Sequence, residues 1–319
     1  MEKSKKERYR EFCALESTLP IFSRDWWLDA VCGDAWDVCL VEKGDSVIAA
    51  MPYCVKKRYG LALLSHPQLT QTLGPWLRPS QAKYAVMLGK EKGLLSELIQ
   101  QLPDFAHYHQ CWHYSKINWQ AFYWQGFQQT TLYTYRLPDL SDLDAIWNGF
   151  RENIRGDIRK ANNRYNLQVR TDLGIDDFLA LNAQTFDRQG KEVPYTPEFV
   201  RRLDKACQAK NSRRIFIAED GQRKRHAGVY VIWDEQSAYY LMGGGDTDLR
   251  SSGATSLCLW EAIQFSATVT NSFDFEGSMI EPVERFIRAF GAIQTPYFSI
   301  KKTPSRLIRL RNSLIDILR

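Results

Sequence analysis

The stretch Tyr239–Leu259 combines residue types and spacing that suit a ligand site. It reads YYLMGGGDTDLRSSGATSLCL, in which an apolar strand ends in three glycines and an Arg-x-x-Gly turn leads into a helix. Glycine permits positive φ and lets a ligand approach the backbone. A helix start presents unbonded N–H groups to an anion, and an arginine beside it adds a fixed charge. The residues that we expect to bind a phosphate-bearing ligand are Gly243, Gly244, Arg250, Ser251, Ser252, Gly253, Ala254 and Thr255.

Two carboxylates at the end of the next expected strand, residues 271–276, are candidates for proton transfer. A carboxylate at a strand end can take a proton from an attacking amine, directly or through a water. We therefore predict Glu276 as a general base, with Asp274 beside it as a second catalytic residue. Both features have plainer alternatives. Ser251 or Ser252 could simply cap the helix after an ordinary loop, and the two acids could cap the next helix or pair with an arginine.

A basic stripe precedes this region. Arg151, Arg155 and Arg159 recur at i, i+4 and i+8 of an expected helix, which either faces solvent or contacts a phosphate-bearing acceptor. We take Arg151, Arg155 and the strand residue Tyr239 as candidate substrate-binding residues. His107, His109 and His113 form a loose trio, but no nearby cysteine or second histidine pair completes a ligand set. No metal site is predicted.

Hydrophobic periodicity and turn residues predict the elements that position these side chains. Helices are expected at residues 22–32, with Ser23 as its cap, and at 80–102, 141–164, 174–188, 196–209, 252–268, 282–289 and after 303. Strands are expected at 36–42, 46–55, 61–65, 105–113, 128–136, 166–171, 214–219, 227–233, 238–242, 271–276 and 294–300. Leu137-Pro138-Asp139 breaks the pattern, so we place a boundary there and expect two domains, residues 1–137 and 138–319.

Composition narrows the class of protein. The 319 residues are 44% hydrophobic and 25% charged, which is ordinary for a globular chain of one or two domains. The net charge of +5 suits a phosphate-bearing ligand without requiring one. No apolar run is long enough to span a membrane, and the first 20 residues lack the apolar core of a signal peptide. Seven scattered cysteines without a C-x-x-C pair argue against a disulfide framework, so we expect a soluble, cytoplasmic protein with reduced thiols.

The order of several short motifs resembles the GNAT superfamily of acyltransferases. Arg250–Thr255 is similar to its pyrophosphate loop, (Gln/Arg)-x-x-Gly-x-(Gly/Ala), with threonine at the last position. Within the superfamily, the Fem-like branch carries two tandem GNAT-like domains. Ser272–Gly277 resembles its Asp-Phe-x-Gly strand end, Phe286–Gly291 its Phe-Lys-x-x-Phe-Gly, and Leu69–Pro75 its Thr/Gly-rich loop.

The resemblance implies an α/β (α+β) fold of two tandem GNAT-like domains, each a mixed, mostly antiparallel sheet flanked by helices. It implies an N-acyltransferase that moves an acyl group, acetyl or longer, from acyl-CoA to an amine, with direct transfer and no covalent enzyme intermediate. A small-molecule acceptor is implied, such as an amino sugar or a peptidoglycan precursor in cell-envelope synthesis. No metal and no specific nucleic acid are expected.

Three alternatives stay open at this point. One is aminoacyl transfer from charged tRNA to a peptidoglycan precursor, which Ile287 weakens because tRNA-using relatives carry lysine there. Another is a GNAT fold that only binds a ligand, which Thr255 keeps open. The third concerns the C-terminal helix, whose Leu307, Leu310, Leu314 and Ile317 share one face. We expect this face to pack against the second domain in preference to peripheral membrane contact.

Overall fold

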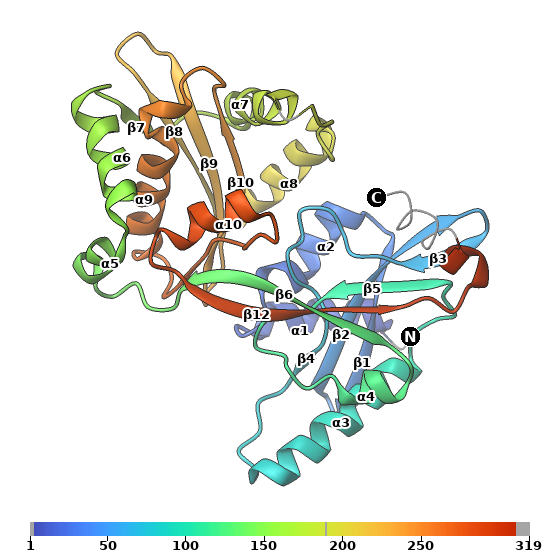
Figure 1. The fold of residues 1–319 in the computed structure, drawn as a ribbon. Helices are drawn as coiled ribbons and strands as arrows, with labels where there is room; N and C mark the ends of the chain where they lie inside the picture. Colours follow the sequence, from blue (N-terminus) through green and yellow to red (C-terminus); the bar gives the residue numbers. More distant parts are fainter. Residues whose placement is uncertain (1–2, 189, 311–319) are drawn as a thin grey trace. The chain divides into compact units, whose positions relative to one another are not determined.

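A computed structural model of the chain describes residues 3–188 and 190–310 (Figure 1). The chain divides into two compact units, Met1–Leu132 with Pro296–Arg319, and Tyr133–Thr295. The sequence placed a boundary after residue 137, whereas the structure returns the last segment of the chain to the first unit. Two strands, β6 (Gln128–Leu137) and β12 (Ile293–Lys302), each begin in one unit and end in the other.

The first unit is built on a mixed sheet whose strands run in the order β1-β2-β3-β5-β12, with β4 paired to β2. Only the β3–β5 pair is parallel, and β1–β2, β2–β3, β2–β4 and β5–β12 are antiparallel. Its strands are β1 (Trp36–Lys43), β2 (Ser46–Arg58), β3 (Leu61–Leu64), β4 (Trp76–Leu77) and β5 (His107–Cys111). Its helices are α1 (Lys5–Leu15), α2 (Asp25–Cys32), α3 (Tyr84–Gln100) and α4 (Gln120–Trp124).

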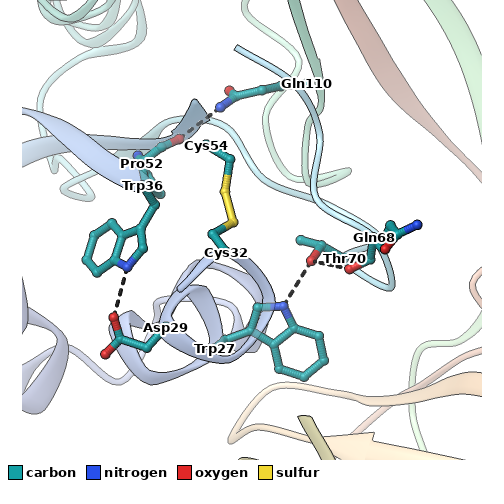
Figure 2. The surroundings of a disulfide bond; sticks show 9 residues. All are labelled: Trp27, Asp29, Cys32, Trp36, Pro52, Cys54, Gln68, Thr70 and Gln110. Atoms are coloured by element: carbon teal, nitrogen blue, oxygen red, sulfur yellow. Dashed lines mark hydrogen bonds between the residues drawn. A yellow bond between two sulfur atoms is a disulfide. The ribbon is translucent and has the colours of Figure 1, made fainter. Parts of the chain in front are cut away.

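A disulfide joins Cys32, the last residue of α2, to Cys54 on β2, with 6.5 Å between the Cα atoms (Figure 2). The expectation of reduced thiols is therefore wrong at this pair. The partners are 22 residues apart and meet only because α2 and β2 pack into one core, which the spacing of the cysteines does not reveal. Cys13, Cys39, Cys111, Cys207 and Cys258 are free thiols. Beside the bond, the indole N–H of Trp27 donates to Thr70 Oγ1 at 3.0 Å, which ties α2 to the loop at 69–75.

The second unit has the sheet order β6-β11-β10-β9-β8-β7. Every neighbouring pair is antiparallel except β10–β11. Its strands after β6 are β7 (Gln168–Arg170), β8 (Arg213–Glu219), β9 (Arg225–Trp233), β10 (Ala238–Gly245) and β11 (Phe273–Asp274). Its helices are α5 (Leu143–Gly149), α6 (Glu152–Asn163), α7 (Ile175–Arg188), α8 (Pro197–Ala209), α9 (Ala254–Ser266) and α10 (Glu281–Arg288), with a 3-10 turn η2 (Arg250–Ser252). Helices α6 and α9 share one core with β8 and β9.

The predicted fold class is confirmed, because both units carry mixed, mostly antiparallel sheets with helices packed on them. Three details differ from expectation. The helix expected at 141–164 is split at Phe150–Arg151 into α5 and α6. Ser23 does not cap α2, whose N-cap is Arg24. A first helix, α1, was missed although Ser4 and Glu7 form a capping box at its start.

The C-terminal segment also differs from expectation. Residues 306–310 are helical, but Leu307 and Leu310 are 74% and 65% exposed, so neither buries a core face. Leu314 and Ile317 lie outside the described residues. Within the described part of the chain, no helix has the length and apolarity to cross a bilayer.

Candidate functional site

The strands β10 and β11 separate in the middle of the second unit's sheet. They pair in parallel at Ala238–Phe273 and Tyr239–Asp274 only. Beyond this point β10 continues along β9 to Gly245, with a bulge between Tyr240 and Met242. The chain after Asp274 instead follows β6, since the Phe275 N–H donates to the Tyr135 carbonyl at 2.9 Å. The predicted catalytic and ligand-binding residues lie on these two diverging segments and on the loop that follows β10.

The glycines of β10 are required by neighbouring protein atoms. A Cβ at Gly244 would lie 2.5 Å from the backbone nitrogen of Asn182 on α7, and one at Gly243 would collide with the hydroxyl of Tyr240. The buried Asn182 side chain donates to the Gly243 carbonyl at 2.8 Å and accepts from the Tyr195 hydroxyl at 3.1 Å. Close packing against α7 gives Gly244 a structural reason, and the assignment of Gly243 and Gly244 to the ligand stays a prediction.

The loop Arg250–Thr255 forms the turn η2 and the start of α9. Gly253 has φ +82° and is the N-cap of α9, so neither serine occupies the cap position. A Cβ at Gly253 would collide with the carbonyl of Asp157 on α6, so the close approach here is made by a helix of the protein. Arg250 and Ser251 are exposed and Thr255 is half-buried. Ser252, Gly253 and Ala254 are buried, so the solvent-facing atoms of the loop come from the first two residues and Thr255.

Asp274, which is buried, and Glu276, which is half-buried, lie together at the end of β11. Asp274 Oδ1 accepts from the Glu276 N–H at 2.7 Å and from the Thr134 hydroxyl on β6. Burial raises the pKa of Asp274 to about 6, against hydrogen bonds from Thr134 and the Glu276 backbone that lower it. Burial, and then the negative charge of Asp274, raise the pKa of Glu276 well above its ordinary value. A carboxyl group whose pKa is raised by its surroundings suits general acid–base catalysis.

The backbone at this strand end is unusual. Glu276 has φ +58° and is followed by Gly277 at φ +54°. A Cβ at Gly277 would collide with the Tyr133 carbonyl on β6, so this position accepts only glycine. A non-glycine residue in the left-handed region costs about 1–3 kcal/mol and persists where the surrounding structure holds it. The Glu276 carboxyl is therefore placed by a strained turn that β6 fixes.

The predicted substrate-binding residues have different environments. Arg155 forms an ion pair with Glu152 at 2.9 Å and donates to the Asn148 carbonyl at 3.0 Å, which joins α5 to α6. Arg159 also contacts Glu152, at 2.7 Å, so one acid partly neutralises the basic stripe. Arg151 is exposed at the N-cap of α6. Tyr239 is buried, with its hydroxyl donating to Asp234 in the β9–β10 turn.

Three residues at the site were missed from the sequence. Thr134 binds Asp274, Tyr240 fills the space beside Gly243, and Asn182 holds the Gly243 carbonyl. Burial raises the pKa of Tyr240, so its hydroxyl stays protonated. Thr134 and Asn182 belong to no motif and reach the site from elements distant in sequence, whereas Tyr240 lies on β10 itself, three residues before Gly243. A polar asparagine on the apolar face of α7 was the one available signal.

The motif Phe286–Gly291 has a structural role. Ile287, which stands where the resemblance expects lysine, is buried in the core of the second unit. Arg288 makes an ion pair with Glu284 at 2.7 Å on the same helix. Ile287 therefore offers no charge to a donor. Among residues 3–188 and 190–310, no cluster of three or more His, Cys, Asp and Glu side chains could hold a metal ion.

Comparison with known proteins agrees with this geometry. Residues 148–277, which include α6, the strand β10, the loop 250–255 and the carboxyl pair, match the family model of the acetyltransferase (GNAT) domain. The chain carries a GNAT domain. The GNAT domain that the sequence predicted is thereby confirmed over these residues. No curated protein matches the chain by sequence.

The fold of the GNAT chain is that of several solved structures. FemX matches with a TM-score of 0.65 at 12% identity, over 93% of this chain and 96% of that one. The C-terminal domain of a putative lysylphosphatidylglycerol synthetase from Agrobacterium fabrum matches with a TM-score of 0.58 at 12% identity, over 98% of both chains. A tandem GNAT protein from the clavulanic acid biosynthesis pathway matches with a TM-score of 0.52 at 11% identity, over 93% and 94%. These likenesses confirm the Fem-like, tandem GNAT fold.

Proposed function

We propose that the second unit catalyses transfer of an acyl group, acetyl or longer, from acyl-CoA to an amine. The observation that carries the proposal is the separation of β10 from β11 beyond Tyr239–Asp274. The carboxyl pair Asp274 and Glu276 lies on one segment, and the positive end of a helix dipole follows the other. The matched GNAT family supports a transferase acting on an acyl donor.

The donor's phosphates would bind at Arg250, Ser251 and the first turn of α9. The exposed guanidinium of Arg250 supplies positive charge, and the helix start supplies N–H groups and the positive end of the dipole. Gly253 has a supporting role, because its left-handed backbone lets the turn meet α6. Thr255 adds a half-buried hydroxyl and leaves the helix start intact.

Glu276 would act as the general base. The acceptor nitrogen bonds to the acyl carbon while one of its protons passes to Glu276. The carbon–sulfur bond then breaks, and the departing sulfur takes that proton from Glu276, directly or through a water, so that CoA leaves as its thiol. Since the pKa of Glu276 lies well above that of an ordinary glutamate, its carboxylate binds the amine proton more strongly. Asp274, with a pKa of about 6, is mostly ionised at neutral pH. Its negative charge helps to keep the pKa of Glu276 raised.

The acceptor class remains a proposal drawn from the family. A small amine, an amino sugar or a peptidoglycan precursor in the cytoplasm fits the predicted role in the cell envelope. A panel of these amines, assayed with acetyl-CoA and longer acyl-CoA by release of free thiol, would identify the acceptor. Calorimetry with acetyl-CoA tests the donor site: Arg250→Ala should weaken binding about tenfold, because charged hydrogen bonds contribute about 1.5–3 kcal/mol. Arg285→Ala, on the exposed face of α10, should leave affinity unchanged, and equal losses in both variants would refute the assignment.

Aminoacyl transfer from charged tRNA is the second candidate function. It is supported by the likeness of the fold to FemX and to a putative lysylphosphatidylglycerol synthetase. We expect it to fail because Ile287 is buried and Glu152 neutralises part of the basic stripe. Filter binding over a salt series is the test, since each phosphate contact adds about −0.7 to −0.9 to the log–log slope. Tight binding at about 150 mM salt that prefers charged over uncharged tRNA would replace acyl-CoA as the donor. A chain that binds acyl-CoA but transfers to no amine would instead be a binding protein.

A further inference from the structure

One face of the first unit's sheet combines basic and apolar side chains. In the β2–β3 pair, Lys56 lies opposite Leu63 and Arg58 opposite Leu61. Leu63 is in turn paired with His107 on β5. Directly paired residues point to the same side of a sheet, so these side chains share one face. Lys301 on β12 joins it, since its partner His109 is two residues from His107.

The segments that form this surface carry charge of a single sign. Residues 55–64 contain three Lys or Arg, and residues 297–310 contain four. Together with residues 105–111 they contain no Asp or Glu. Lys56, Lys57, Arg58, Lys301, Arg306 and Arg309 are all exposed. A surface with this composition attracts anions and repels cations.

An apolar groove of about 630 Å³ opens on the same face. Leu61 and Leu63 line one side, and Leu307 and Ile308 of the C-terminal segment line the other. Arg58 and His107 are the polar residues at the groove. Apolar side chains also project around it: Tyr59 is 88% exposed, Leu307 74% and Leu310 65%. Contiguous exposed apolar groups of this kind mark a surface that is covered by a partner.

We propose that this surface, defined by Lys56, Arg58, Leu61, Leu63, Lys301 and Leu307, binds the surface of an anionic phospholipid bilayer. The lysines and arginines meet the phosphate layer, and Tyr59, Leu307 and Leu310 enter the boundary between headgroups and acyl chains. The presence of both basic and exposed apolar side chains favours a lipid bilayer over other anionic partners. A nucleic acid would satisfy the positive charge but would leave the exposed aliphatic side chains in water, whereas a bilayer accommodates both. This binding is separate from acyl transfer, since every residue involved lies in the first unit.

Co-sedimentation of the full chain with vesicles tests the proposal. Vesicles of phosphatidylcholine with about 30% phosphatidylglycerol should bind the chain, and pure phosphatidylcholine should bind it at least tenfold more weakly. Lys56→Glu with Arg58→Glu should lower the partition coefficient for anionic vesicles at least tenfold, because each basic residue near such a surface contributes strongly. Leu307→Ser with Leu310→Ser should lower it as well, including at about 0.5 M salt, where charge attraction is screened.

Matched controls use side chains of the same kind elsewhere in the first unit. Lys83→Glu with Lys90→Glu changes two exposed lysines, and Leu15→Ser with Tyr84→Ser changes two apolar side chains that are 87% and 72% exposed. Both should bind vesicles as the parent does, and melting curves should show that all variants are folded. The proposal is overturned if the controls lose as much binding as the test variants, or if phosphatidylcholine binds equally well. Displacement of the chain from vesicles by a low concentration of tRNA would assign the surface to nucleic acid instead.

Discussion

The backbone N–H of Glu276 donates to Oδ1 of Asp274 at 2.7 Å, which holds these two acidic residues within one turn of the chain. Glu276 itself has a positive φ of +58°. Asp274 is also bonded by Thr134 on the neighbouring strand, so the pair is fixed from two sides. The negative charge of Asp274 adds to the effect of burial in raising the pKa of Glu276.

Glu276→Gln should lower the rate of acyl transfer by about 10²–10⁴, since a positioned general base is typically worth that factor. Glutamine keeps the size of the side chain but cannot accept the proton. Acyl-CoA affinity, measured by calorimetry, should stay within a factor of two or so. Glu281→Gln, on an exposed residue of α10, is the control and should keep the parent rate. Full turnover by the Glu276 variant would remove the residue from the mechanism.

Asp274→Asn should change how stability depends on pH. The pKa of Asp274 is raised from 3.8 to about 6 in the folded chain, so its protonated form adds stability that is complete below 3.8 and is lost as pH rises through 6. Asparagine can still accept from Thr134 and from the Glu276 N–H, and it carries no charge. Relative to the parent, the variant should gain up to about 3 kcal/mol of unfolding free energy between pH 4 and pH 7. Urea melts at both pH values measure this difference, and a pH-independent difference would contradict the assigned pKa.

Gly253→Ala should destabilise the chain by about 2 kcal/mol or more. The new Cβ would meet the Asp157 carbonyl, and alanine is strained at φ +82°. Gly156→Ala is the matched control, because its Cβ would meet nothing within 4 Å and helix α6 favours alanine. Thermal melts should therefore separate the two variants in opposite directions. Equal melting would mean that α6 and the loop are not in close contact.

The Cys32–Cys54 disulfide predicts how many cysteines of the chain react with a thiol reagent. With seven cysteines in the chain and two in the bond, five should react with a thiol reagent under denaturing, non-reducing conditions, and seven after reduction. Closing a loop of 22 residues contributes about 3 kcal/mol in the chain-entropy account. Reductant should therefore lower the melting temperature of the parent. Cys54→Ser should melt at one temperature with or without reductant, and seven reactive thiols in the untreated parent would disprove the bond.

Sequence patterns predicted the helices and strands that bury one apolar face. They did not predict contacts between residues that are distant in the sequence. Helix α7 was found at residues 174–188 and is observed at Ile175–Arg188, because its apolar positions recur with helical spacing. The carboxyl pair was found because both acids lie on one short segment. The contact of Gly253 with Asp157 joins residues 96 positions apart, and no local pattern encodes it. The same holds for Thr134, which is 140 residues from its partner Asp274.

The place of strand β12 near the end of the sequence affects when the first unit can complete its sheet. Its residues Ser299–Lys302 pair with β5, so the sheet of the first unit includes a strand that is synthesised after the whole of the second. Domains generally fold as units during synthesis, starting from the N-terminus. The amino-terminal unit departs from this order, because its sheet lacks the last strand until residues 299–302 have been made. The first unit, although its synthesis begins first, can therefore complete its sheet only after the second unit has been made.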